Sequence, residues 1–221
     1  MDAIILAAGS GLRMNSNTPK QFLRIKGKPL FIYSLELFDK CSFIDKIYIT
    51  CNKEYMHLYN EFISMYDIKN VECIEGGSTR QESVYKALSY VDTPKVMIHE
   101  AARPLIDLEF MNSVFSSDID IDADAVVPTI PVKFTVAIGN DFMESELNRT
   151  KLHNVQLPQI FNKEILFSAH EKALNDNYEA TEDGMLVFHY GGRVKFVEGR
   201  ESNIKVTTQL DIELIENLLK L

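Results

Sequence analysis

Short apolar runs rich in β-branched residues alternate along this chain with segments of helical periodicity. The runs lie at 3–8, 46–50, 71–75, 95–99 and 123–127. Such alternation predicts a mostly parallel β-sheet, because parallel strands need helical crossovers between them. Several runs are apolar at consecutive positions, which indicates that helices cover both faces of the sheet. We therefore expect an α/β fold, a three-layer sandwich built on a Rossmann-like sheet.

Two of the intervening segments carry recognisable helix starts. Ser78 and Gln81 have the spacing of a capping box. The apolar face that follows comprises Val84, Ala87, Leu88 and Val91. Thr208 and Asp211 resemble a second cap, and the stripe predicted to dock the last helix comprises Leu210, Leu214, Ile215 and Leu218.

One stretch departs from this rhythm. From Val132 to Ile138 apolar and polar residues alternate, the period-2 pattern of a strand with one covered face, and a turn is predicted at 139–141. We predict a projecting β-arm at about 132–156, with its apolar face covered by the body or by a second copy of the chain. No linker or repeat divides the rest, so we expect one domain over 1–221.

The charge balance excludes some function classes. The chain has 23 basic and 32 acidic residues, a formal net charge of −9. A negative field repels phosphate, so we expect no binding to nucleic acid or to anionic membranes, and an anionic ligand would need a locally basic site. No apolar run approaches the roughly twenty residues that span a bilayer.

Composition also bears on the compartment. Cys41, Cys51 and Cys73 are odd in number and lack CxxC spacing, which favours a reducing cytoplasm and no structural zinc. The opening MDAIILAAG has an acidic second residue and too short an apolar stretch for a secretory signal. We interpret it as a buried strand and expect a cytoplasmic protein.

The first strand runs directly into the glycine-bearing segment AAGSGLRM. Met14 stands where a dinucleotide fingerprint needs its third glycine and where a P-loop needs its second, so neither motif is present. Backbone N–H groups of such a loop can surround phosphate, and Arg13 and Lys20 can neutralise charge at a phosphorus centre. The alternative is an ordinary turn with solvated charges.

The order of several motifs makes a family recognisable. The segments LAAGSGLRM, TPKQFL, EGGSTRQESV, HEAARP, NRTKLHNVQLPQ and VEGRESNIKVTT resemble those of cytidylyltransferases that join CMP to methylerythritol phosphate or ribitol phosphate. The resemblance covers essentially the whole chain. It implies a fold of the nucleotide-diphospho-sugar transferase type and a reaction of CTP with a polyol phosphate, with Mg²⁺, giving a CDP-polyol and pyrophosphate.

The resemblance also implies roles for individual residues. Arg13, Lys20 and Lys205 would be catalytic, because fixed positive charge stabilises a phosphoryl centre whose bonds are exchanged. The nucleotide-binding set would be Ala7, Ala8, Gly9, Ser10, Gly11, Gly77, Ser78, Arg80 and Ser83. Ser78 has the alternative of capping its helix without touching a ligand.

Four residues would serve the acceptor. Glu100 stands where the family usually carries aspartate, which is associated with magnesium and substrate hydroxyls, and Arg103 could fork onto the acceptor phosphate. Thr135 and Arg149, on the arm, match positions that reach the neighbour's site in related dimers. We therefore expect a homodimer. His99 is interpreted as a packed residue, because transfer to an ionised phosphate needs no base.

Two departures leave the acceptor open. Phe134 replaces an aspartate of the methylerythritol enzymes and Leu157 replaces a threonine, so a polar group is lost at each position. Methylerythritol phosphate is our leading prediction, and ribitol 5-phosphate or another alditol phosphate of wall or capsule polymers is the alternative. A non-catalytic nucleotide-binding dimer module is a third possibility. An NAD-dependent oxidoreductase is disfavoured, because KIYITCN offers no ribose-binding carboxylate.

Overall fold

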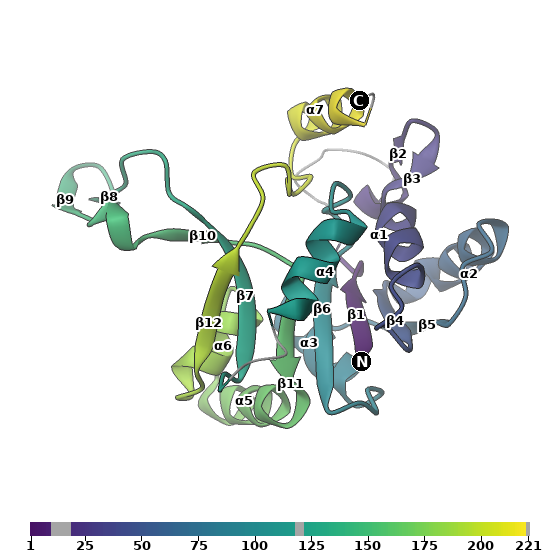
Figure 1. The fold of residues 1–221 in the computed structure, drawn as a ribbon, viewed down its shortest axis with the longest axis horizontal. Coiled ribbons are helices and arrows are strands. Elements are labelled where there is room, and N and C mark those ends of the chain that lie inside the picture. Colours follow the sequence, from purple (N-terminus) through teal and green to yellow (C-terminus); the bar gives the residue numbers. More distant parts are fainter. Residues whose placement is uncertain (10–18, 118–121, 220–221) are drawn as a thin grey trace.

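A computed structural model of the chain describes residues 1–9, 19–117 and 122–219. Within these residues one sheet of eight strands runs through the molecule, in the order β10-β7-β11-β6-β1-β4-β5, with β12 paired to β7 (Figure 1). The strands are β1 (Asp2–Leu6), β4 (Ile47–Cys51), β5 (Val71–Glu75), β6 (Lys95–Glu100), β7 (Ala125–Pro131), β10 (His153–Val155), β11 (Gln159–Asn162) and β12 (Val194–Glu198).

The sheet is mostly parallel, as the sequence predicts. β5, β4, β1 and β6 pair in parallel, β12 pairs in parallel with β7, and β10 and β11 are antiparallel to β7. From β1 the chain first builds β4 and β5 on one side and then returns to place β6 on the other. Ligands bind at such a switch point, outside the carboxyl ends of the strands.

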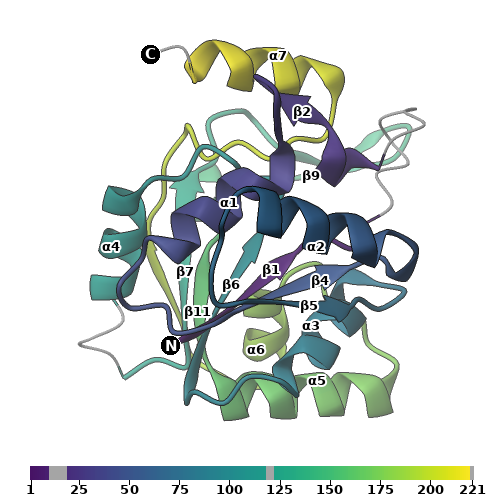
Figure 2. The ribbon, with the colours of Figure 1, turned by 90° about the vertical axis from the view of Figure 1, so that its right-hand side faces the viewer.

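Helices cover both faces of the sheet (Figure 2). One face packs against α1 (Leu30–Asp39), α2 (Met56–Met65) and α4 (Leu108–Ser116); the other packs against α3 (Arg80–Leu88), α5 (Lys163–Asp176) and α6 (Asp183–His189). In β1, Ala3 and Ile5 enter the first core and Ile4 the second. Both faces of the strand are therefore buried, which explains its unbroken apolar run.

Short elements complete one end of the sandwich. The 3₁₀ helix η2 (Lys20–Phe22) leads into a small hairpin of β2 (Arg24–Ile25) and β3 (Lys28–Pro29), and η3 (Lys53–Tyr55) precedes α2. The last helix, α7 (Gln209–Leu218), lies across this end (Figure 2). Its capping box at Thr208 and Asp211 is present as predicted.

The buried face of α7 agrees with the predicted stripe at Ile215 but not at Leu210 and Leu214. Ile215 is 0% exposed and Ile212 is buried, and they pack in a small cluster with Ile25 and Val206. Leu210, by contrast, is 71% exposed, and Leu214 is also exposed. Because α7 packs on this small cluster beside the sheet, Ile212 and Ile215 face inward in place of Leu210 and Leu214.

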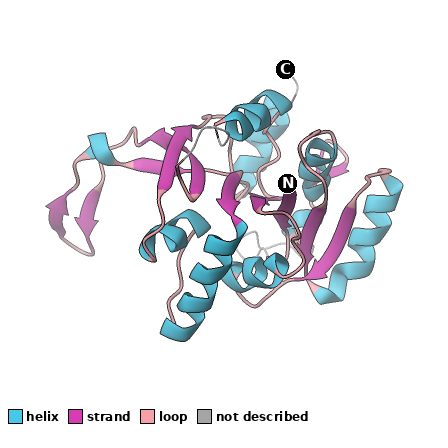
Figure 3. Cartoon of the chain, turned by 60° about the horizontal axis from the view of Figure 1, so that its bottom comes forward, coloured by secondary structure: helices cyan, strands magenta, loops and turns pink. Residues whose placement is uncertain are grey.

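The predicted arm projects from the sandwich (Figures 1 and 3). It carries the hairpin of β8 (Ala137–Gly139) and β9 (Met143–Glu146), followed by η4 (Arg149–Lys151). Regular strand on the arm begins only at Ala137, which pairs with Glu146, although the N–H of Val132 donates to the carbonyl of Leu152 nearer the sheet. The body of this chain does not cover the arm, since Phe134 is 83% and Phe142 is 85% exposed. No helix in the described ranges is both long and apolar enough for a membrane span.

Truncating a buried side chain of α7 should destabilise the protein, whereas truncating an exposed one should not. Ile215→Ala should lower the free energy of unfolding by about 2 to 5 kcal/mol, because it opens a cavity in the cluster that docks the helix. Leu210→Ala should change it by less than about 0.5 kcal/mol. Urea denaturation of both variants measures this, and an equal loss would contradict the assigned face.

Candidate active site

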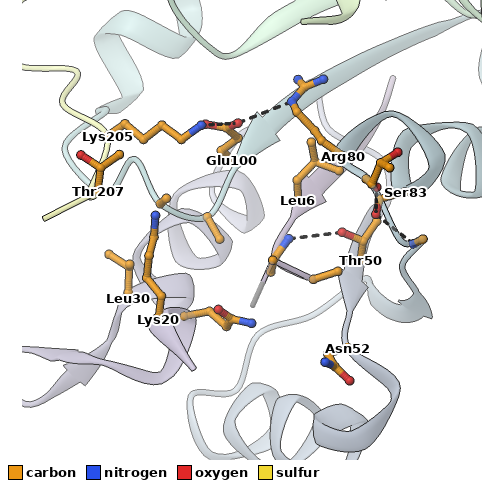
Figure 4. Close-up of a pocket in the computed structure, with 18 of the residues that line it drawn as sticks. Leu6, Lys20, Leu30, Thr50, Asn52, Arg80, Ser83, Glu100, Lys205 and Thr207 are labelled. Atoms are coloured by element: carbon orange, nitrogen blue, oxygen red, sulfur yellow. Dashed lines mark hydrogen bonds and ion pairs between the residues drawn. The ribbon is translucent and has the colours of Figure 1, made fainter. Parts of the chain in front are cut away.

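A cleft of about 760 Å³ opens at the carboxyl ends of β1, β4 and β6. Its wall combines the segment after β1, the loop between β5 and α3, the end of β6, η2 and the segment that connects β12 to α7. Figure 4 shows Lys20, Arg80 and Lys205 around this space with Glu100 between the last two. The cleft is locally basic in a chain of net charge −9, as an anionic ligand requires.

Most of the residues implied by the resemblance meet at this cleft. Those that line it are Ala7, Ala8, Gly9, Lys20, Gly77, Ser78, Arg80, Ser83, Glu100 and Lys205. Ser10, Gly11 and Arg13 lie outside the described residues. Lys20 and Lys205 are far apart in sequence, yet the Nζ of Lys20 donates to the carbonyl of Val206, the neighbour of Lys205.

Three predicted residues do not line the cleft. Arg103 is buried, and its Nη1 donates to the carbonyl of Asn203 over 2.9 Å. Thr135 and Arg149 lie on the arm, where the Nη1 of Arg149 donates to the carbonyl of Lys133. Leu157, one of the departures from the family pattern, is also buried outside the cleft lining, so no cleft-facing group is lost there.

The backbone that opens the cleft is fixed from both sides. The N–H of Ala7 donates to the carbonyl and the Oγ1 of Thr50, each over 3.2 Å, and the hydroxyl of Tyr59 donates to the carbonyl of Ala7 over 2.8 Å. The loop after β5 approaches so closely that a Cβ on Gly76 would overlap the Cβ of Ala8. Glycine is therefore needed at this contact, a role that the sequence analysis missed.

The start of α3 differs from the predicted cap by one residue. The side chain of Thr79, not Ser78, accepts from the N–H of Glu82 over 3.0 Å. Ser78 donates its N–H and its hydroxyl to the Glu82 carboxylate, each over 2.6 Å. Ser83 accepts from the N–H of Gly77 and donates to the carbonyl of Thr79, each over 2.9 Å. These bonds give the loop from 77 to 79 its shape at the cleft wall.

Glu100 is the centre of the charge arrangement. Its Oε1 lies 2.8 Å from the Nζ of Lys205 and 3.5 Å from the Nε of Arg80, and its Oε2 lies 3.5 Å from the Nε of Arg103. Burial opposes ionisation of this carboxyl, but the positive charges of Lys205 and Arg80 hold its pKa at about 2. Glu100 is therefore ionised at neutral pH and fixes cations from separate parts of the chain.

Two carboxylates that the sequence analysis missed hold the other side of Arg80. Its Nη2 lies 2.7 Å from the Oδ2 of Asp183 and 3.0 Å from the Oε2 of Glu182. Asp183 is 1% exposed, and its other oxygen lies 3.5 Å from the Nε2 of His170. Burial disfavours the Arg80 charge, but Asp183 and Glu182 raise the pKa of the guanidinium. Nothing in the local pattern around 182–183 indicates this pairing, because it forms only when the fold brings the start of α6 to the start of α3.

Further cleft residues come from strand ends. Thr50 belongs to β4 and Asn52 follows it, and both line the cleft with Gln21 and Thr207. The sequence could have indicated Asn52 as a cleft residue, because it is a polar residue directly after a buried strand. His99, by contrast, is fully buried with its ring 5.3 Å from that of Phe38. Burial lowers its pKa to about 3, as expected of a packed, neutral histidine.

Glu182 predicts a pH-dependent stability. Burial raises its pKa to about 7, against the attraction of Arg80 and with repulsion from Glu100 and Asp183. The folded state thus binds this proton more tightly than the unfolded state, and ionising Glu182 destabilises the fold as pH rises towards 7. Glu182→Gln should therefore stabilise the protein by about 3 kcal/mol at pH 8 and by about 1 kcal/mol or less at pH 5. Denaturant unfolding at the two pH values measures the difference, and an increment independent of pH would contradict the raised pKa.

Known proteins are similar to this chain over nearly its whole length. The family model for 2-C-methyl-D-erythritol 4-phosphate cytidylyltransferase matches residues 1–221. The enzyme of that name from Clostridium botulinum (strain ATCC 19397 / Type A) is 39% identical over 224 residues, which cover 98% of this chain and 96% of that protein. The one from Clostridium novyi (strain NT) is 36% identical over 221 residues, 99% of this chain and 96% of that protein.

A solved structure agrees with these sequence relatives. The crystal structure of 4-diphosphocytidyl-2C-methyl-D-erythritol synthase from Anaerococcus prevotii DSM 20548 superposes with a TM-score of 0.86 at 29% identity, covering 100% of this chain and 98% of that one. The α/β fold predicted from the sequence is thereby confirmed. By sequence and by fold, the chain belongs to the 2-C-methyl-D-erythritol 4-phosphate cytidylyltransferase family.

Proposed function

We propose that this chain transfers the CMP group of CTP to 2-C-methyl-D-erythritol 4-phosphate, forming CDP-methylerythritol and pyrophosphate for isoprenoid precursor synthesis. One observation carries the proposal beyond family membership: Lys20 and Lys205, from opposite ends of the sequence, meet Arg80 at a single cleft. Three cationic side chains around one cleft suit a triphosphate, whose charge a protein of net charge −9 would otherwise repel.

The proposed reaction is a direct displacement. An oxygen of the acceptor phosphate attacks the α-phosphorus of CTP, a new P–O bond forms, and the bond to the bridging oxygen breaks as pyrophosphate leaves with the electron pair. Arg13, Lys20 and Lys205 stabilise the charge that spreads over the phosphoryl oxygens. No covalent intermediate and no general base are needed, in keeping with the burial of His99.

The nucleotide occupies the wall built by the first strand and the loop before α3. The described backbone after β1, at Ala7, Ala8 and Gly9, lines the cleft that the phosphates and the base would occupy, and Ser10 and Gly11 keep the nucleotide-binding role that the resemblance implies. Gly77, Ser78, Arg80 and Ser83 enclose the cytidine from the opposite side. Because Ser83 and Ser78 already shape their loop through hydrogen bonds, their part in binding is to present its backbone.

The residues present fit a magnesium ion that arrives with the nucleotide. Among the described residues no group of three or more His, Cys, Asp or Glu side chains could enclose a metal. Mg²⁺ is commonly held by one or two carboxylates together with substrate phosphates. Glu100 offers such a carboxylate, since it is ionised and its buried Oε2 accepts no hydrogen bond. Bound there, the metal would neutralise phosphate charge.

The acceptor site is proposed to be shared between two copies of the chain. Thr135 and Arg149 lie on an exposed arm and do not line the cleft of their own chain. A partner's arm would bring them to it in a homodimer, which would also cover the apolar arm face. Glu100 would contact acceptor hydroxyls, with Arg103 acting through Glu100, which it flanks. The three free cysteines suit the cytoplasm as the site of the reaction.

The reaction and the role of Lys20 can be tested together. With CTP and Mg²⁺, pyrophosphate release should be fastest with methylerythritol phosphate in a panel that includes ribitol 5-phosphate. Lys20→Ala should lower kcat by about 100-fold or more with the fold intact, because it removes transition-state charge stabilisation. Lys69→Ala, which removes an exposed lysine near Asp67, is the matched control and should keep full activity. Faster turnover of ribitol phosphate would replace the acceptor, and a fully active Lys20→Ala would remove its role.

Subunit complementation tests the shared site. Lys20→Ala and Arg149→Ala dimers should each be nearly inactive, because one lacks a cleft cation and the other an arm cation. Mixed and re-equilibrated, they should regain about a quarter of wild-type activity, since half the dimers are mixed and each mixed dimer has one intact site. Light scattering reports the dimer. No recovery in exchanging dimers would show that arm and cleft belong to the same chain.

A further inference from the structure

Two buried amide side chains fasten the segment that carries Lys205 to the base of the arm: Gln156, which follows β10, and Asn203 of the segment itself. This segment, residues 199–206, leaves β12 at the end of the sheet where β10 enters from the arm (Figure 1). The register agrees, because Glu198 of β12 and Val155 of β10 both pair with Thr129. Gln156 directly follows β10 and is buried.

Gln156 makes a two-point bond to the backbone of Arg200. Its Nε2 donates to the Arg200 carbonyl over 2.8 Å, and its Oε1 accepts from the Arg200 N–H over 2.9 Å. The side-chain amide thus pairs with both the N–H and the carbonyl of Arg200, as a residue of a neighbouring antiparallel strand does in a hydrogen-bonded pair. Such a bond fixes orientation as well as distance.

A glycine makes this contact possible. A Cβ at Gly199 would overlap the Oε1 of Gln156 and would lie 2.9 Å from the carbonyl oxygen of Thr129. Position 199, directly before Arg200, must therefore lack a side chain. The family motifs QLPQ and EGR, otherwise without a role in the proposed reaction, meet at this point.

The bond is supported on both sides. The Nε2 of Gln159 donates to the Gln156 carbonyl over 3.1 Å, and its Oε1 accepts from the N–H of Gly184, next to Asp183, over 3.2 Å. Towards the cleft, the Nδ2 of Asn203 donates to the Leu157 carbonyl over 2.6 Å. Lys205 follows two residues later and meets Glu100 at 2.8 Å. These contacts act together with the bonds from Arg103 to the Asn203 carbonyl and from the Val206 N–H to the Ala102 carbonyl, and they fix the backbone on both sides of Lys205.

We propose that Gln156 is a positioning residue for the transfer reaction: it holds the 199–206 segment against the arm base so that Lys205 reaches the phosphates of CTP. The inference rests on the proposed function, because it gives Lys205 the phosphate-binding role assumed there. Gln156 does not line the cleft. Its contribution is geometric, and displacing a catalytic group by about 1 Å can cost about 100-fold in rate.

The test is a double-mutant cycle between Gln156 and Lys205. Gln156→Ala should lower kcat by about 10- to 100-fold with the fold retained by circular dichroism. The double variant Gln156→Ala/Lys205→Ala should be no slower than Lys205→Ala by more than about 2-fold, because the position of an absent ammonium cannot matter.

Gln81 provides a matched control within the same chain. Its Nε2 donates to the Tyr178 carbonyl over 3.0 Å and its Oε1 accepts from the Ala180 N–H over 2.8 Å, a similar pair of bonds away from the Lys205 segment. The fold-change in kcat of the double variant Gln81→Ala/Lys205→Ala should therefore equal the product of the fold-changes of the two single variants. If Gln156→Ala also multiplies with Lys205→Ala, or leaves kcat unchanged, the proposal is overturned.

A binding measurement separates this proposal from the proposed function. Titration of each variant with CTP and Mg²⁺ by calorimetry gives a second double-mutant cycle. Gln156→Ala and Lys205→Ala should each raise the Kd for CTP, and the double variant should bind CTP about as weakly as Lys205→Ala alone. That result supports the positioning role even if the acceptor is not methylerythritol phosphate. Wild-type CTP affinity retained in Gln156→Ala, together with an unchanged kcat, would overturn the role while leaving the transferase activity in place.

Discussion

The carboxylate of Glu100 is the point on which the cleft depends. It is buried at the end of β6 and contacts Arg80, Arg103 and Lys205, which come from three separate parts of the chain. A buried charge without partners costs several kcal/mol, so burial of Glu100 is tolerable only while these cations stay near. The same requirement acts in reverse, because the carboxylate keeps the cations clustered in a protein whose net charge is −9. The described lining of the cleft still has three cationic side chains against the one carboxylate of Glu100, so the site is basic in an acidic molecule.

The carboxylates around Arg80 add a second layer to this arrangement. Asp183 and Glu182 hold the guanidinium from the side away from Glu100, and Asp183 is itself buried beside His170. The pKa values separate the two acids: that of Asp183 is lowered to about 2 and that of Glu182 is raised to about 7. Asp183 gives Arg80 a permanent partner, whereas the charge of Glu182 varies near neutral pH. A site built in this way is preorganised, since charged groups are held in place by the protein and not by solvent.

Two kinds of interaction therefore position the cations. Charge pairs hold the groups that face the cleft, while amide hydrogen bonds from Gln156 and Asn203 hold the backbone that carries Lys205. The amide bonds begin where the arm joins the sheet. The arm itself exposes Phe134 and Phe142, surface that a partner copy would cover in the proposed dimer. The 199–206 segment therefore contacts the base of the arm, proposed to serve the acceptor, and also carries Lys205 to the cleft proposed to bind the nucleotide.

The sequence by itself determined the layered α/β fold, the positions of five strands and the existence of the arm, because periodicity and apolar runs are local properties of the chain. It did not predict β11 and β12 of the same sheet. It also identified Lys20, Lys205 and the glycine loops, since the order of the motifs is specific to a family. It missed the cap at Thr79 by one residue and the buried face of α7, where neighbouring positions compete and packing decides between them. Only the tertiary structure could reveal that Glu182 and Asp183 pair with Arg80. The same holds for the hydrogen bonds from Gln156 to Arg200 and from Arg103 to Asn203. Each of these contacts joins segments far apart along the chain, and their pairing depends on how the layers pack, which no local pattern encodes.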